Sequence, residues 1–233
     1  MQPDALRFPV ARRSFLSRLT AGAALFGFGA VTARAQTTPA SPWAPAVHAE
    51  DDWYAQIPGK HRFFFDTTSA GALTNCVVYA NNFFDANRDG YGLEDRDLAV
   101  VVCLRHFSTP FAFGDAVWAK YGAPMARAMQ FSDPATKEIP TVNVYLRSGA
   151  GMPSPTRGVT LQSLAGRGVH YAVCGVATRA FAGIIGQATG GASSDIYKEL
   201  VANTVPNSHM VTAGIVAVNR AQERGYTFAY AEA

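Results

Sequence analysis

The sequence is poor in cysteine, and its three cysteines are not arranged in pairs. Cys76, Cys103 and Cys174 lie far apart, and none of them belongs to a CxxC motif. An odd number of widely spaced cysteines argues against a disulfide framework, although one pair among the three stays open. We therefore expect at least one free thiol.

Motifs for metal ions and nucleotides are also missing. No zinc-ligand spacing occurs among the five histidines, which are His48, His61, His106, His170 and His209. The stretch 85–96 begins like a calcium loop with Asp85, Asn87, Asp89 and Gly90, but Arg96 stands where the loop needs a glutamate. A solvated turn between a helix and a strand explains this stretch better. No GxGxxG follows the first predicted strand, and the glycines of 184–193 are misplaced for a dinucleotide loop. We expect no metal and no cofactor.

An export signal is predicted at the N-terminus. The sequence RRSFL at 12–16 precedes a mildly apolar segment, 19–31, and the triplet ARA at 33–35 offers the small residues that signal peptidase requires, so Gln36 is the expected mature start. RRSFL resembles the twin-arginine (Tat) consensus, which directs folded proteins to the periplasm. The alternative, a membrane anchor, fits poorly because this short Gly- and Ala-rich segment would have to cross about 30 Å of hydrocarbon.

Most of the basic character of the chain belongs to this signal. Residues 1–35 hold five arginines and one aspartate, so their removal changes the formal net charge from +3 to −1. A mature protein with this charge offers no basic patch for nucleic acid or for an anionic membrane surface. We therefore expect a periplasmic protein with neither partner after signal cleavage.

The remaining chain divides into an arm and one domain. Residues 36–59 are rich in Pro, Ala and polar side chains without periodicity, which is typical of a linker or extended arm. Trp43, Trp53 and Tyr54 indicate that this arm docks on some surface and does not trail freely. Residues 60–233 are expected to form a single α/β domain without internal repeats.

Strand-like and helix-like segments alternate through that domain. Strands are predicted within 61–69, 98–107, 169–175, 209–214 and 226–231, and helices within 71–88, 110–122, 160–168, 178–187, 194–204 and 215–225. Residues 123–159 are hardest to interpret: 141–148 is an extra strand or an extended excursion, and 149–158 is a loop. The alternation predicts a three-layer α/β/α sandwich with a mostly parallel sheet of about five strands.

Ligands of such sheets bind beyond the carboxyl ends of the strands. Four segments follow predicted strands and are expected to share one rim: 66–69, 105–109, 174–179 and the turn around Gly214.

Cys174 is the main candidate for chemistry at this rim. It ends a strand ahead of a helix expected to start near Thr178, so unpaired amides and the helix dipole should favour its thiolate, and Arg179 can add positive charge. The alternative is that Cys174 packs as a small apolar side chain, as free cysteines often do. Cys76 and Cys103 are expected in the core.

Arg105 and His106 are the candidate ligand-binding residues on the neighbouring strand. Arg105 can pair with an oxyanion such as thiosulfate, and His106 can orient or deprotonate a ligand. Ser108 and Thr109 can contribute to the same site. The alternative is that His106 is a hydrogen-bonded strand-end residue and that Ser108 or Thr109 caps a helix beginning near Pro110.

Asp66 and Thr67 are ambiguous in the same way. They follow the first predicted strand and can bind a ligand at the rim, but Asp66, Thr67, Thr68 and Ser69 can equally supply the N-cap of the next helix.

The second half of the domain resembles the DsrE/DsrF-like family of small α/β sulfur-relay proteins. The residues that carry the resemblance are the lead-in Leu164, Gly168 and Val169, the cysteine Cys174, and the tail Gln222, Gly225 and Tyr226. The first two predicted strands also fit, so the resemblance covers about 60–233. It implies a homo-oligomer, a trimer or hexamer, and a thiol that carries sulfane sulfur as a persulfide.

These observations lead to one main functional hypothesis and two alternatives. The main hypothesis is an exported sulfur-carrier or thiol-relay protein that uses Cys174 and exchanges sulfur with a donor or acceptor protein. The alternatives are a non-catalytic oligomeric binding module for a small ligand or partner protein, and a purely structural oligomer. Phe111, Phe113 and Trp118 are expected to contribute to a subunit interface.

Overall fold

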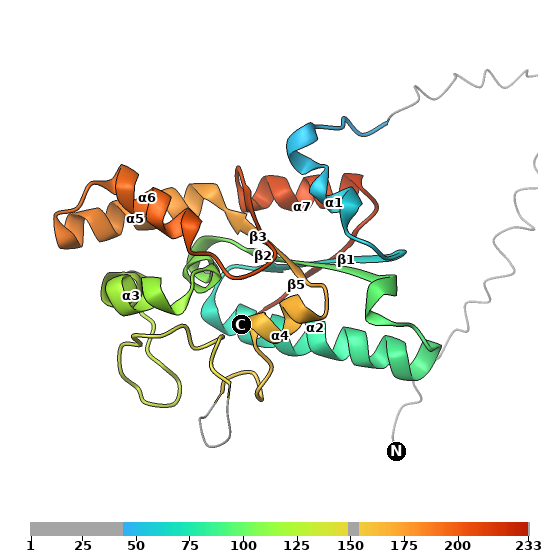
Figure 1. Cartoon of the computed structure of the whole chain (residues 1–233), viewed down its shortest axis with the longest axis horizontal. Coiled ribbons are helices and arrows are strands. Elements are labelled where there is room, and N and C mark those ends of the chain that lie inside the picture. Colours follow the sequence, from blue (N-terminus) through green and yellow to red (C-terminus); the bar gives the residue numbers. More distant parts are fainter. Residues whose placement is uncertain (1–43, 149–153, 233) are drawn as a thin grey trace, which may run out of the picture. The chain divides into compact units, whose positions relative to one another are not determined.

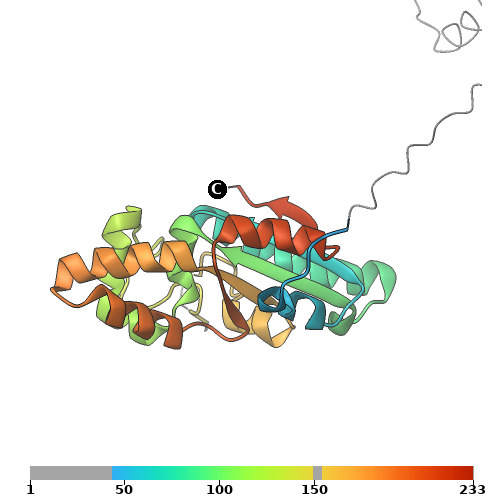
Figure 2. The same cartoon turned by 90° about the horizontal axis from the view of Figure 1, so that it is seen from above.

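Five parallel strands form the centre of the structure, a computed structural model that describes residues 44–148 and 154–232 (Figures 1 and 2). Helices cover both faces of the sheet, so the predicted three-layer α/β/α sandwich with about five strands is confirmed. The predicted signal, 1–35, and Trp43 lie outside the described residues.

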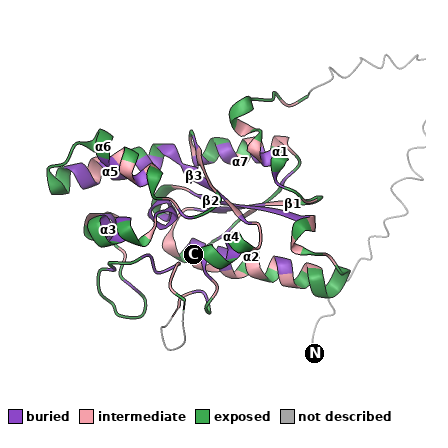
Figure 3. Ribbon diagram, in the orientation of Figure 1, coloured by how far each residue is buried: buried purple, intermediate pink, exposed green. Residues whose placement is uncertain are grey.

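The sheet has the strand order β4-β3-β2-β1-β5. The strands are β1 (His61–Thr67), β2 (Leu98–Leu104), β3 (His170–Cys174), β4 (Ser208–Val211) and β5 (Thr227–Tyr230). All seven residues of the central strand β2 are buried, because its alternate side chains pack into the helical layers on opposite faces (Figure 3). The nearly continuous apolar run of this strand reflects that double burial.

The larger apolar core lies on one face of the sheet. It is formed with α2 (Ala70–Tyr91), α3 (Asp115–Met129), α4 (Leu161–Gly166), α5 (Gly175–Thr189) and α6 (Ser193–Ala202). The predicted apolar stripe of α2 is buried, as Leu73 and Phe84 show at its two ends. Ser69 caps this helix by accepting a hydrogen bond from the Ala72 N–H at 3.1 Å.

The other face is covered by α7 (Gly214–Glu223) and by the arm, which contains the 3-10 turn η2 (Ala49–Asp51) and α1 (Trp53–Gln56) (Figure 1). Tyr54 is fully buried, and its hydroxyl donates to the Ala217 carbonyl oxygen at 3.3 Å. The Trp53 ring stacks on His209 with centroids 3.9 Å apart. The described part of the arm is therefore an integral part of the second layer.

The segment after β2 differs from the predicted helix 110–122. A 3-10 helix, η4 (His106–Ala112), comes first, and α3 follows after Gly114 and continues through Gly122. A Cβ atom at Gly122 would lie 2.5 Å from the Pro140 carbonyl oxygen, so this glycine permits close approach of the next loop and does not mark the helix end.

The aromatic residues of this segment belong to the core of the subunit. Phe111 and Phe113 are fully buried and Trp118 is 1 % exposed. The expectation that they form a subunit interface is therefore wrong, because their rings are already covered within the chain.

The excursion 123–159 contains no strand in the part that the structure describes. Its 141–148 portion is an irregular segment anchored by Asn143, whose amide donates to the carbonyl oxygens of Phe111 and Phe113, each at 2.8 Å. An ion pair between Asp133 and Arg147 closes the loop.

The stretch that begins like a calcium loop is helical. Asp85, Asn87, Asp89 and Gly90 all belong to the last turns of α2, which ends at Gly92 with a φ of +66°. The solvated turn is therefore shorter than predicted. These side chains project in different directions from a helix and do not converge as they would in a calcium loop.

None of the helices within the described residues has the length and hydropathy needed to cross a bilayer.

Candidate functional site

The carboxyl ends of four strands meet as predicted. Because β1 to β4 are parallel neighbours, the segments after them lie along one rim of the sheet. Among the contacts that join them, the Gly214 N–H lies 3.2 Å from the Cys174 sulfur, and the Arg105 guanidinium binds the Asp66 carboxylate. The expectation of a shared rim is confirmed.

Cys174 is both the last residue of β3 and the N-cap of α5. Its Sγ accepts hydrogen bonds from the Ala177 N–H at 3.4 Å and from the Gly214 N–H at 3.2 Å. The helix begins at Gly175, three residues earlier than predicted, because the cysteine sulfur itself supplies the cap. Two N–H donors and the positive end of a 15-residue helix therefore converge on one sulfur atom.

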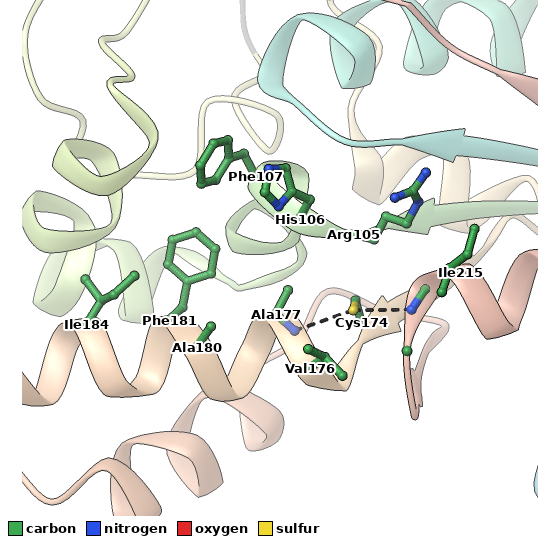
Figure 4. Close-up of a pocket in the computed structure, with 12 residues that line it drawn as sticks. Arg105, His106, Phe107, Cys174, Val176, Ala177, Ala180, Phe181, Ile184 and Ile215 are labelled. Atoms are coloured by element: carbon green, nitrogen blue, oxygen red, sulfur yellow. Dashed lines mark hydrogen bonds between the residues drawn. The ribbon is translucent and has the colours of Figure 1, made fainter.

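A pocket of about 370 Å³ opens beside Cys174 (Figure 4). The cysteine is only 6 % exposed, so its sulfur is reached through this pocket and not from the open surface. Most of the lining is apolar: α5 contributes Val176, Ala177, Ala180, Phe181 and Ile184, and three further apolar side chains come from Phe107, Ala213 and Ile215.

Arg105 lines the pocket, and its positive charge is already paired with the negative charge of Asp66. Its Nε and Nη2 atoms donate to the two carboxylate oxygens of Asp66, each at 2.7 Å, and this pairing raises the pKa of the arginine. Asp66 is 2 % exposed and does not cap α2, since Ser69 does. The structure therefore pairs these two predicted site residues with each other.

His106 stands at the mouth of the pocket. Its φ of +56° is unusual for a residue with a side chain and costs about 1–2 kcal/mol. Its exposed ring stacks on Phe107 with centroids 4.1 Å apart, and Phe107 is itself 39 % exposed. An unfavourable backbone conformation thus holds an imidazole and a phenyl ring beside the opening.

Three other predicted site residues do not reach the pocket. Thr67, Ser108 and Thr109 are fully buried, and their hydroxyls donate to backbone carbonyl oxygens at 2.7–3.1 Å. Neither Ser108 nor Thr109 caps the following helix, whose N-cap is Gly114. The Ser108 and Thr67 hydroxyls connect β1 with β2 and the turn after it, and the Thr109 hydroxyl binds this turn to the end of β2.

Arg179 also lies away from this pocket. Its guanidinium carbon is 5.9 Å from the centre of the Tyr197 ring, and the side chain lines a separate depression between α5 and α6. Arg179 therefore makes no direct contact with the Cys174 sulfur, but its Nη1 atom lies 3.5 Å from where a Cβ of the neighbouring Gly175 would be, so its positive charge stays near the start of α5.

The other two cysteines are inaccessible, as predicted. All three cysteines lie in the described part of the chain and are free, but Cys76 and Cys103 are completely buried. Burial raises the pKa of both thiols well above the ordinary value. Only Cys174 borders a pocket.

Histidines and carboxylates of the described residues do not gather into a metal site. Within 44–148 and 154–232, no three His, Cys, Asp or Glu side chains are placed to hold an ion. His170 and His209 share a hydrogen bond of 2.8 Å beneath Trp53, on the face covered by the arm.

The apolar lining is the part of the site that sequence reasoning missed. Ala177, Ala180, Phe181 and Ile184 follow helical spacing, and this pattern reads equally well as an ordinary core face. The available signal was that the sequence of α5 is apolar around most of its circumference, more than one buried face requires.

Comparison of the chain with protein-family models, with curated proteins and with solved structures finds no match. The function must therefore be inferred from the pocket, its cysteine and the charges around them.

Proposed function

We propose that the protein is a sulfur carrier in which Cys174 accepts sulfane sulfur and holds it as a persulfide. The observation that supports this proposal is the convergence of two backbone N–H groups on the Cys174 sulfur at the end of a pocket. Such donors stabilise a thiolate, which is the nucleophilic form of cysteine.

The reaction is a transfer between sulfur atoms without net oxidation. The Cys174 thiolate attacks the outer sulfur of a donor R–S–SH, a new S–S bond forms to Cys174, and the donor S–S bond breaks. The products are Cys174–S–SH and the thiolate R–S⁻, so atoms and charge balance. The reverse reaction delivers the sulfur to an acceptor thiol.

Neighbouring groups have separate roles in this proposal. The N–H groups of Ala177 and Gly214 position the sulfur and stabilise its negative charge before attack. His106, exposed at the mouth, can give a proton to the departing thiolate.

The proposal agrees with the resemblance to DsrE/DsrF-like proteins and with the Tat-like N-terminus. It includes export to the periplasm, a homo-oligomeric state, and a donor or acceptor protein as partner. Replacement of Arg12 and Arg13 by lysine should keep the precursor in the cytoplasm, and unchanged export of that double variant would refute this part.

Mass spectrometry tests the carrier function directly. Reduced protein incubated with inorganic polysulfide should gain mass in steps of one sulfur atom. The gain should be lost in Cys174→Ser and retained in the double variant Cys76→Ala/Cys103→Ala, which keeps Cys174 as the only thiol. Loading of Cys174→Ser at the parent level, or no loading of the parent by any persulfide donor, would refute the proposal.

The second candidate is a binding module without covalent chemistry. The 6 % exposure of Cys174 and the apolar lining of the pocket favour it. In that case an apolar ligand should bind equally well to the parent and to Cys174→Ser, and neither protein should acquire sulfur.

A further inference from the structure

The lining of the pocket beside Cys174, called the channel below, follows helix α5. Ala177, Ala180, Phe181 and Ile184 lie on one face of α5, so the apolar stripe starts next to the cysteine and runs along the helix (Figure 4). Ten residues separate Cys174 from Ile184, which corresponds to about 15 Å of helix. Along α5 the thiol therefore lies near one end of the channel, with Ile215 beyond it, and apolar side chains form most of the lining toward Ile184.

This channel has little free charge for an anion. Of the described side chains that line it, none is a carboxylate or a lysine, and the guanidinium of Arg105 is bound through two nitrogens to Asp66. Arg179, the other cation of this region, does not line the channel: it borders a different depression, and its Nη1 atom lies on the far side of the α5 N-terminus, 3.5 Å from where a Cβ of Gly175 would be. His106 is the remaining titratable group and lies at the mouth.

These features favour an apolar substrate over an inorganic dianion. A polysulfide or thiosulfate ion entering the channel would lose its hydration and gain few charged partners, which is costly. A hydrocarbon chain that lies along α5 is removed from water, which makes the free energy of binding more favourable by about 0.8 kcal/mol for each buried CH₂ group. This energy corresponds to an increase of about fourfold in a binding or rate constant for each CH₂ group.

We propose, on the basis of the carrier function proposed above, that the sulfur donor is a neutral organic sulfur compound with an apolar chain. Its reactive sulfur lies against Cys174, and its chain extends along α5 toward Ile184. This proposal replaces the earlier expectation of an oxyanion at Arg105, because Asp66 already binds the Arg105 guanidinium.

A homologous series of alkyl methanethiosulfonates tests this selectivity. The Cys174 thiolate attacks the sulfur that bears the alkyl chain, a disulfide to Cys174 forms, and methanesulfinate leaves with the electron pair of the broken S–S bond. Rate constants are measured with the double variant Cys76→Ala/Cys103→Ala and divided by those of free cysteine. From methyl to butyl, the ratio should rise two- to fourfold per CH₂, and the anionic sulfonatoethyl reagent should react more slowly than the propyl reagent.

Two substitutions on α5 separate the channel from general effects of the helix. Ala180 is exposed to the channel, so Ala180→Leu should fill it and abolish the chain-length dependence while the methyl reagent still reacts. Gln187→Leu, at an exposed position of the same helix that does not line the channel, should leave the dependence unchanged.

A third substitution tests the role of charge. Asp66→Asn leaves a hydrogen-bonding side chain next to Arg105 but removes the negative charge. The sulfonatoethyl reagent should then gain at least threefold relative to the propyl reagent, and an unchanged ratio would contradict the argument from charge.

The outcomes distinguish this inference from the carrier function. If rates do not depend on chain length, or if Ala180→Leu has no effect, the organic substrate is refuted, while polysulfide loading at Cys174 can still support a carrier. If chain length matters but an alkyl persulfide leaves no sulfur on Cys174, the carrier function fails. Labelling that slows as protein concentration rises would mean that a second copy covers the channel, and this would also overturn the inference.

Discussion

Gly214→Ala should damage the site and the fold together, because the first turn of α7 lies against Arg105. A Cβ atom at Gly214 would come within 2.5 Å of Arg105 Cβ, 2.8 Å of Cδ and 3.1 Å of Cγ. The Arg105 side chain cannot easily adopt another conformation, because its backbone directly follows β2 and its guanidinium is bound to Asp66.

The expected change in the free energy of unfolding follows from two opposing effects. Overpacking of this kind costs about 1–3 kcal/mol. Alanine is better than glycine in a helix by up to about 1 kcal/mol, and by less at the first helical position. Gly214→Ala should therefore be less stable than the parent by roughly 1–2 kcal/mol.

Urea unfolding measures this change, and Gly183→Ala is the matched control. Gly183 lies within α5 and a Cβ there meets no atom within 4 Å, so alanine should raise stability by up to about 1 kcal/mol. In Gly214→Ala the displaced N–H should also leave Cys174 less reactive toward a small thiol reagent. Equal stability of the two variants, together with unchanged labelling of Cys174, would refute the close packing described for this turn.

Three further predictions concern stability and can be checked by urea unfolding. Burial and the nearby His170 lower the pKa of His209 to about 4, so below pH 6.5 the unfolded chain binds more protons at this residue than the folded protein does. The free energy of unfolding should therefore fall by roughly 1–2 kcal/mol from pH 6.5 to pH 4. A free energy of unfolding that stays constant over this range would contradict the prediction. Tyr54→Phe removes the hydroxyl that donates to Ala217 and should cost about 1 kcal/mol, whereas no loss would mean that this buried bond contributes nothing. Thr160→Ala removes the capping box of α4 and should also cost about 1 kcal/mol, while Thr160→Ser should restore most of it.

The fold was predictable where burial leaves a clear pattern in the sequence. The unbroken apolar run of β2 identified a strand covered on both faces, and the alternation of strands with helices determined the layers. The common rim followed from the parallel sheet alone, because the ends of parallel strands lie on one side. The sequence therefore places Cys174 and Arg105 at one edge of the sheet.

The details of the site depend on partners that are distant in the sequence. Asp66 neutralises Arg105 across 39 residues, and the Gly214 N–H approaches Cys174 across 40 residues. The start of α5 was misplaced because its cap is a cysteine, a residue type that is not typical of N-caps. The apolar channel was missed because a stripe that lines a pocket and a stripe that faces a core have the same spacing.

The docking of the arm has a consequence for synthesis of the chain. Tyr54 is among the first described residues, yet its hydroxyl bonds to Ala217, 163 residues later. At roughly 5–20 residues per second, about 8–30 s pass between the appearance of these two residues at the ribosome. During that interval α7 does not exist, so apolar side chains on this face of the sheet, such as Val101, lack the cover that α7 supplies. The nascent chain therefore presents an apolar surface to chaperones until its last helix has been made.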